Sequence, residues 1–223
     1  MKSLVLSLFF LPSVLFSQNN DSLVLKKIYN FYLTQSKCYS NLEFLTTKIG
    51  GRLTGSAEAE KAVAWAKKAM YEAGADTVIL QPCMVPHWVR GKKEKCILTS
   101  PKTKALPLNC VALGSSVGTG NTGLSAAVIE VKSFDQLKAL GEKNIRGKIV
   151  FYNVFFDQSL INPGQAYGAT VQYRSRGASY AAKYGAVAVV VRSMTSLADD
   201  EPHTGNMNYD TSLSKSRIPA FAL

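Results

Sequence analysis

The second half of the chain alternates short apolar runs with two helical segments, and this order restricts the fold more than any other feature. The runs have the length and composition of buried strands, and they cover residues 126–131, 147–152, 186–191 and 218–222. Residues 133–140 begin with a serine that can cap a helix, and residues 176–185 end in a glycine that can stop one. This order predicts an α/β unit in which two helices flank a small mixed sheet.

The first half carries helical spacing before any strand signal. Residues 21–36 and 40–48 have apolar positions three and four apart, and a glycine-rich loop at 49–56 leads into an alanine-rich helix from Ser56 to Gly74. A strand is expected next at 76–80, followed by alternating, strand-like runs at 84–89, 95–99 and 106–113. A glycine-rich linker is expected at 114–123. Helix, glycine loop, helix and strand predict the edge of a larger α/β layer.

The first 17 residues resemble a secretory signal peptide. Lys2 precedes an apolar stretch, Ser17 is small enough for a cleavage site, and polar residues follow. A buried N-terminal helix is the alternative. Export would permit disulfides among the four cysteines at positions 38, 83, 96 and 110, whose spacing matches no zinc-binding pattern. Paired and free thiols both stay open, because four cysteines allow three pairings.

Composition excludes several function classes. Lysine and arginine exceed aspartate and glutamate by 26 to 15, which gives a net charge of +11. The basic residues are scattered, and no nucleic-acid-binding motif accompanies them, so a solvated basic surface is expected. No stretch after the leader is apolar enough to span a bilayer, so we expect no membrane contact after signal cleavage.

The chain offers few groups for catalysis. Its two histidines are His87, within an expected strand, and His203, beside the acidic residues 199–201. Three carboxylates and an imidazole could hold a cation, but consecutive acids favour a solvated loop. Residues 118–123 spell Gly-x-Gly-x-x-Gly without opening a helix, which argues against a dinucleotide site. Arg174 and Arg176 could contact a carboxylate or lead into the following helix.

Several segments, in order, resemble secreted two-zinc exopeptidases of the carboxypeptidase Q type. The N-terminal signature is similar at "KIGGRLTGS" (48–56), "HWVRG" (87–91) and "LGSSVGT" (113–119). The inserted protease-associated domain of this family is similar at "IRGKIVFYN" (145–153), "RGASYAAKYGAVAVVVRS" (176–193), "EPHTGNMNY" (201–209) and "RIPAFAL" (217–223). The resemblance covers nearly all of the chain after the leader.

The resemblance implies a signal peptide at 1–17, the edge of an α/β peptidase core at 18–115 and a β-rich protease-associated domain with flanking helices at 116–223. It implies an exported zinc metallopeptidase that removes residues from short peptides with two zinc ions. No position here matches the family's metal-ligand or catalytic motifs, so none is assigned. Only His203, Thr204 and Gly205 are expected near the substrate, because their loop lies where the insertion returns to the core.

We therefore expect the N-terminal portion of such an enzyme, secreted or periplasmic, inactive alone and without bound zinc. A stand-alone protease-associated module that binds peptides or proteins is the alternative. A short peptide is the expected partner and nucleic acid is not, while a homodimer is an expectation for the complete enzyme only. As an isolated piece, residues 18–115 should expose a large apolar patch, because their helices would lack a covering layer.

Overall fold

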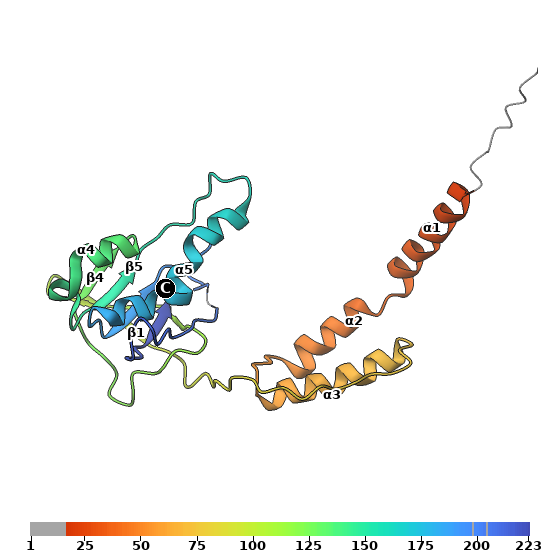
Figure 1. Cartoon of the computed structure of the whole chain (residues 1–223), viewed down its shortest axis with the longest axis horizontal. Helices are drawn as coiled ribbons and strands as arrows, with labels where there is room; N and C mark the ends of the chain where they lie inside the picture. Colours follow the sequence, from red (N-terminus) through yellow and green to blue (C-terminus); the bar gives the residue numbers. More distant parts are fainter. Residues whose placement is uncertain (1–16, 198, 204) are drawn as a thin grey trace, which may run out of the picture. The chain divides into compact units, whose positions relative to one another are not determined.

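The computed structural model describes residues 17–197, 199–203 and 205–223 (Figure 1). The predicted signal peptide lies outside the described residues except for Ser17. The chain divides into two compact units, Met1–His87 and Trp88–Leu223, which are described separately here as unit 1 and unit 2. The boundary predicted between residues 115 and 116 separates the peptidase-core edge from the protease-associated domain. It stays a prediction.

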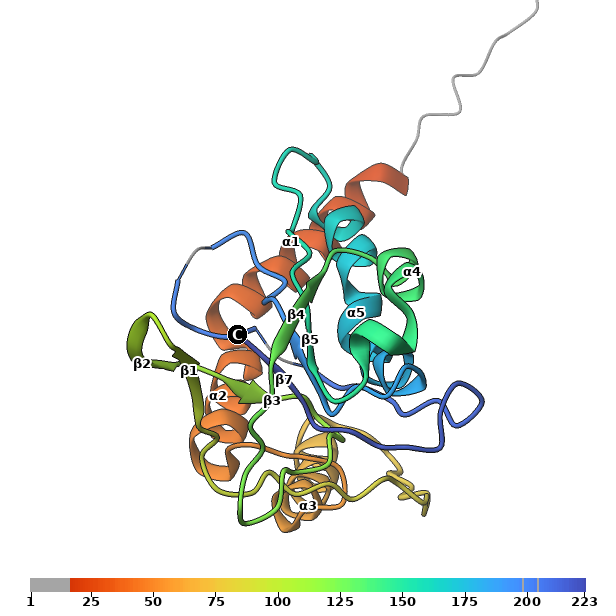
Figure 2. The same ribbon diagram turned by 90° about the vertical axis from the view of Figure 1, so that its left-hand side faces the viewer.

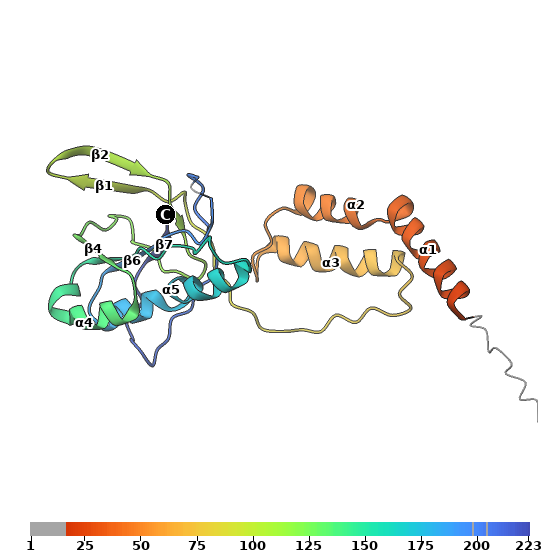
Figure 3. The same ribbon diagram turned by 90° about the horizontal axis from the view of Figure 1, so that it is seen from above.

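Unit 1 is helical. Its elements are α1 (Ser17–Gln35), α2 (Cys38–Glu43), the π-helix η1 (Phe44–Ile49) and α3 (Ala57–Glu72). Ser56 caps α3 as expected, since its Oγ accepts a hydrogen bond of 3.1 Å from the Ala59 amide. The rings of Phe44 and Trp65 stack with their centroids 5.4 Å apart and pack η1 against α3. Helices α2 and α3 lie side by side in this unit (Figure 3). The predicted helices of this half are confirmed.

Two predicted strands of the first half are wrong. Residues 77–91 contain neither helix nor strand, so the segments 76–80 and 84–89 form no sheet, and His87 does not lie in a strand. A strand persists only when a neighbouring strand satisfies its backbone groups. No strand lies beside these segments within the described residues, so their alternating apolar pattern has no ladder to join.

Unit 2 contains a hairpin and a sheet. The hairpin strands β1 (Cys96–Ser100) and β2 (Thr103–Leu108) are antiparallel, with Cys96 opposite Leu108. The sheet strands are β3 (Val111–Ala112), β4 (Val128–Val131), β5 (Ile149–Tyr152), β6 (Ala188–Val191) and β7 (Ala220–Ala222), in the order β3-β7-β6-β5-β4. Strands β4 to β7 are parallel neighbours and β3 is antiparallel to β7, so the predicted mixed sheet is confirmed.

The predicted strand 106–113 needs correction, because the chain divides it between two sheets. Its first part belongs to the β1–β2 hairpin, and its last part forms β3 at the edge of the larger sheet. Asn109 and Cys110 lie between the two strands, where the chain leaves one sheet for the other.

Two helices connect the parallel strands and pack on one side of the sheet (Figure 2). Helix α4 (Phe134–Ile145) follows β4, and α5 (Pro163–Lys183) follows β5. Right-handed crossovers between successive neighbouring strands place both helices on the same face. Helix α5 begins 13 residues before the predicted start at 176, because Asn162 caps it by accepting a 2.9 Å hydrogen bond from the Gly164 amide.

The core lies between these helices and the sheet. The fully buried side chains include Leu113, Val131, Leu137, Ile145 and Val150. The ring of Tyr152 lies among them, and its hydroxyl donates a 3.0 Å hydrogen bond to the Gly177 carbonyl of α5. A Cβ at Gly177 would stand 2.7 Å from this ring, so the glycine allows α5 to approach the sheet closely.

Candidate functional site

The predicted substrate-proximal loop lies beside helix α5. Of its three residues the structure describes His203 and Gly205, while Thr204 lies outside the described residues. The His203 amide donates a 2.8 Å hydrogen bond to Ser193 Oγ, and its exposed ring meets the Tyr167 ring edge-on at 6.2 Å. The loop is therefore anchored at the end of β6 and against α5.

Arg174 of α5 reaches this loop. Its Nη2 donates a 2.8 Å hydrogen bond to the Tyr167 hydroxyl, and its guanidinium lies 5.8 Å from the Tyr167 ring centroid. A Cβ at Gly205 would overlap the guanidinium, 1.4 Å from Nη1, so a larger residue here would require the Arg174 side chain to move. The structure thus places Arg174 within α5 and in contact with the loop, whereas the sequence favoured a helix lead-in. Arg174 and Gly205 are 31 positions apart, so the sequence pattern does not predict their contact.

His87 has a structural contact in unit 1. Its Nδ1 lies 2.8 Å from the Gly55 carbonyl oxygen. A carbonyl only accepts, so Nδ1 carries the proton in this contact. The Thr54 hydroxyl donates a 2.9 Å hydrogen bond to the Pro86 carbonyl beside it. These two bonds join the glycine-rich loop to the segment 86–87, which lies 32 residues further along the chain.

Arg52 joins the same glycine-rich loop to the helix that precedes it. Its Nη1 donates to the carbonyls of Leu45 in η1 and of Gly50, the residue that follows η1. The Leu45 carbonyl also accepts a 3.0 Å hydrogen bond from the Gly50 amide, so the guanidinium adds a second donor where η1 ends. The "GGRLTGS" segment therefore acts here as a connector that ends one helix and, through Ser56, begins the next.

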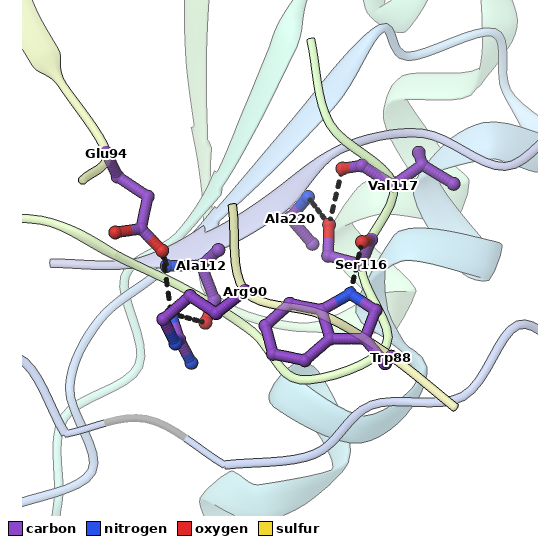
Figure 4. Close-up of polar contacts among 7 residues, drawn as sticks. All are labelled: Trp88, Arg90, Glu94, Ala112, Ser116, Val117 and Ala220. Atoms are coloured by element: carbon purple, nitrogen blue, oxygen red, sulfur yellow. Dashed lines mark hydrogen bonds and ion pairs between the residues drawn. The ribbon is translucent and has the colours of Figure 1, made fainter. Parts of the chain in front are cut away.

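A second hydrogen-bond network joins three of the segments by which the sequence resembles the exopeptidase family (Figure 4). Trp88 Nε1 donates a 2.9 Å hydrogen bond to the Ser116 carbonyl. Ser116 Oγ accepts from the Ala220 amide at 2.8 Å and donates to the Val117 carbonyl at 2.9 Å. Ser116 is 8 % exposed, so its hydroxyl satisfies a β7 amide that water hardly reaches.

Arg90 and Glu94 hold the edge strand β3 in the same region (Figure 4). Glu94 Oε1 accepts from Arg90 Nη1 at 2.6 Å and from the Ala112 amide at 3.0 Å, and Arg90 Nη1 also donates to the Ala112 carbonyl at 3.1 Å. Partial burial opposes ionisation of Glu94, but the amide and the guanidinium outweigh it, so the pKa of Glu94 lies below its usual value. Sequence reasoning gave these residues no role; the only signal was their place in or beside "HWVRG".

Several known proteins are similar to this chain. No protein-family model matches the chain. Carboxypeptidase Q of Xenopus laevis is 40% identical over 181 residues, which are 81% of this chain and 36% of that protein, and the Homo sapiens protein is 39% identical over the same shares. The chain belongs to the family of carboxypeptidase Q and the M28 peptidases. It spans little more than a third of the length of these curated relatives.

A solved member of the family has the same fold. The peptidase M28 precursor from Shewanella amazonensis superposes with a TM-score of 0.81 at 33% identity, over 92% of this chain and 45% of that one. This superposition confirms the mixed α/β class that the sequence predicted.

The described residues of the present chain do not fit a two-zinc centre. Within residues 17–197, 199–203 and 205–223, no group of three or more His, Cys, Asp or Glu side chains is placed to hold a metal ion. A catalytic zinc requires three protein ligands around one open position. No step of peptide hydrolysis can therefore be derived from the described side chains.

The cysteines are free in the structure. Cys38 and Cys83 are exposed, while Cys96 and Cys110 are partly buried near the end of the hairpin. Burial, together with the nearby Cys96 thiol and Glu94 carboxylate, raises the pKa of Cys110 to about 11. Its thiol is therefore protonated at neutral pH. No helix in the described part of the chain combines the length and the apolar character needed to cross a bilayer.

Proposed function

We propose that this sequence forms the N-terminal part of an exported, zinc-dependent exopeptidase that hydrolyses short peptides. The observation that carries the proposal is the 40% identity to a carboxypeptidase Q over 181 residues. The networks around Ser116 and Gly55 support it, because they use the segments by which the sequence resembles this family.

In this proposal, residues 18–115 contribute the edge of the peptidase core, and residues 116–223 form the inserted protease-associated domain. The zinc ligands and the general base belong to a part of the enzyme beyond this sequence, since the described residues do not fit the metal centre. The chain alone is then inactive. When bound in the complete enzyme, the zinc ions would activate the water that attacks the peptide bond.

The loop of His203, Thr204 and Gly205 would lie near the substrate of the complete enzyme. The contacts of His203 with Ser193 and of Gly205 with Arg174 support this role, because they fix the loop on a rigid helix and strand. An exposed imidazole held in this way can donate to or accept from a peptide group.

A peptide-binding module without catalysis is the second candidate. It is favoured by unit 2, whose sheet and helices enclose a buried core within residues 113–222. Both candidates predict that the 223-residue chain does not hydrolyse peptides, so the native protein must separate them.

The test compares the 223-residue chain with the native protein that carries this sequence, isolated from its source cells by an antibody raised against the chain. The native protein should hydrolyse a panel of dipeptides, lose this activity to 1,10-phenanthroline and recover it with zinc, while the chain shows no turnover. A native protein without chelator-sensitive activity would favour the binding module. Turnover by the 223-residue chain would overturn the placement of the catalytic groups.

A further inference from the structure

A cavity of about 290 Å³ opens at the carboxyl ends of the parallel strands β5 and β6 in unit 2. Side chains of Phe151, Phe155, Arg192, Asn109 and Asp200 are among its walls. Ligands of open α/β sheets bind outside the carboxyl ends of parallel strands, because the loops that follow the strands converge there. The cavity lies at this edge, and neither the family motifs nor the proposed hydrolysis assigns it a role.

The cationic wall of the cavity is Arg192, the first residue after β6. Its Nη1 donates a 3.0 Å hydrogen bond to Asn153 Oδ1, and its guanidinium carbon lies 3.9 Å from the Phe155 ring centroid. The Arg192 amide also donates to the Tyr152 carbonyl at 3.1 Å. These contacts fix the guanidinium without neutralising it, because an amide oxygen and an aromatic ring carry no net charge.

The anionic wall is the segment Asp199–Glu201, which is also exposed to solvent. Asn109 holds it, since its Nδ2 donates to Asp200 Oδ2 at 2.8 Å and to the Asp200 carbonyl at 3.2 Å. Asp199 Oδ1 accepts from the Glu201 amide at 3.3 Å. Across the described part of the chain, none of these carboxylates forms an ion pair with Arg192 or with any other basic side chain.

Two opposite charges thus line one cavity without pairing with each other, and aromatic side chains lie beside them. A metal ion would use only the carboxylates, and a simple anion would use only the guanidinium. A free peptide carries both an ammonium and a carboxylate, and its side chains add apolar surface. A guanidinium binds a carboxylate through charge-assisted hydrogen bonds, which are stronger than neutral ones.

We propose that this cavity binds a short zwitterionic peptide. Its α-carboxylate pairs with Arg192, its ammonium faces Asp199–Glu201, and its apolar side chain packs on Phe151 and Phe155. A volume of about 290 Å³ lies just below the usual range for ligand pockets, which suits a ligand as small as a dipeptide. The site requires no hydrolysis, so it rests on the second candidate, the peptide-binding module, and not on the proposed peptidase activity.

The probe is glycyl-leucine, titrated by isothermal calorimetry at low salt into the 223-residue chain. The chain's own C-terminal carboxylate is amidated, because Leu223 also lines the cavity and a free carboxylate there would compete for Arg192. Mass spectrometry verifies that the peptide stays intact. N-acetyl-glycyl-leucine lacks the ammonium, and glycyl-leucinamide lacks the carboxylate. Each should bind about tenfold more weakly than glycyl-leucine, because each loses one charge-assisted contact. Absence of glycyl-leucine binding at 10 mM, on the order of the weakest ligand contacts, or equal affinity for all three probes overturns the proposal.

Variants locate the two charges. Arg192→Gln should weaken glycyl-leucine binding about tenfold and leave glycyl-leucinamide unchanged, because the amide has no carboxylate to lose. Arg176→Gln is the matched control, since Arg176 stacks on Tyr180 and does not line the cavity. The double variant Asp199→Asn and Glu201→Gln, in exposed positions, should weaken glycyl-leucine but not its N-acetyl form. Wild-type affinity in both the Arg192 variant and the double variant would also overturn the proposal.

Discussion

The two units differ in how far they bury their apolar side chains. In unit 2, Leu137 of α4 is fully buried and packs with Val131, Ile145 and Val150 in one cluster. In unit 1, Leu33 of α1 is 70% exposed, and no residue of α2, η1 or α3 is buried. Large apolar side chains are exposed along the described part of unit 1, including Leu23, Leu25, Tyr29, Tyr32, Leu42, Val63, Met70 and Ile79.

The difference shows that similar helices need not have similar stability. A helix gains most of its stability from burying an amphipathic face, and local propensity alone leaves a short helix marginal in water. Helices α4 and α5 have a sheet to pack on, whereas α1 and α3 keep their apolar residues in contact with solvent. Residues 88–115 belong to unit 2, so the apolar patch that the sequence predicts for an isolated piece 18–115 stays a prediction.

The largest expected effect compares one leucine from each unit. Leu137→Ala should lower the free energy of unfolding of unit 2 by about 2–5 kcal/mol, because it leaves a cavity in a packed core. Leu33→Ala should change stability by less than about 0.5 kcal/mol, because its side chain already contacts water. Urea unfolding followed by Trp88 fluorescence in a Trp65→Phe background reports unit 2 alone, and circular dichroism reports the helices of unit 1.

Equal losses from the two leucine substitutions would contradict the comparison. They would mean that α1 is buried in solution, against a second copy or another partner. Sedimentation of the Leu33 variant and of the wild type would then show whether association supplies this burial.

Two glycines give the next contrast. Gly177→Ala should cost unit 2 about 1–3 kcal/mol, because the added methyl would lie 2.7 Å from the buried Tyr152 ring. Gly51→Ala meets nothing within 4 Å and has no positive φ, so it should be neutral or stabilise unit 1 by up to about 1 kcal/mol. The midpoints of thermal unfolding measure both, and a stabilising Gly177→Ala would show that α5 can move away from the sheet.

The smallest expected effect concerns charge. The lowered pKa of Glu94 means that its stabilisation is fully present above its unfolded pKa, near about 4.3, and is lost as the pH falls through the folded value. Glu94→Gln should therefore destabilise unit 2 by about 1–2 kcal/mol at pH 7, and the difference should shrink as the pH falls below the unfolded pKa and through the folded one. Thermal melts of both proteins over this pH range measure the difference.

Glu72 in unit 1 is the control for this pair. Its Oε1 lies 3.7 Å from Lys68 Nζ on the exposed face of α3, so Glu72→Gln should cost no more than about 0.5 kcal/mol. A pH-independent loss in the Glu94 variant would show that packing, and not ionisation, explains the role of Glu94.

Local signals predicted the elements more reliably than their partners. Ser56 and Ser133 cap the helices that follow them, as the sequence indicated, because a cap acts within three residues of itself. The run at 76–80 has an equally clear strand pattern, yet it forms none in the described structure. The start of α5 was missed because the pattern from 163 to 175 mixes glycine and polar residues with few apolar ones.

The contacts within the candidate sites could not be predicted from the spacing of residues in the sequence. Ser116 and Ala220 are 104 positions apart, and Asn109 and Asp200 are 91 positions apart. The sequence singled out the loop at His203 and the acids at 199–201. It gave no indication that Arg174 lies against the first, or that Arg192 faces the same cavity as the second.

The sequence by itself determined the helix caps, the alternation of strands and helices in unit 2, and the family, because these depend on residues a few positions apart or on their order. Tertiary structure decided which runs pair, which apolar faces are covered, and that opposite charges line one cavity. Those outcomes depend on where distant segments meet, and a hydrogen bond or a buried contact forms only after the chain has folded back on itself.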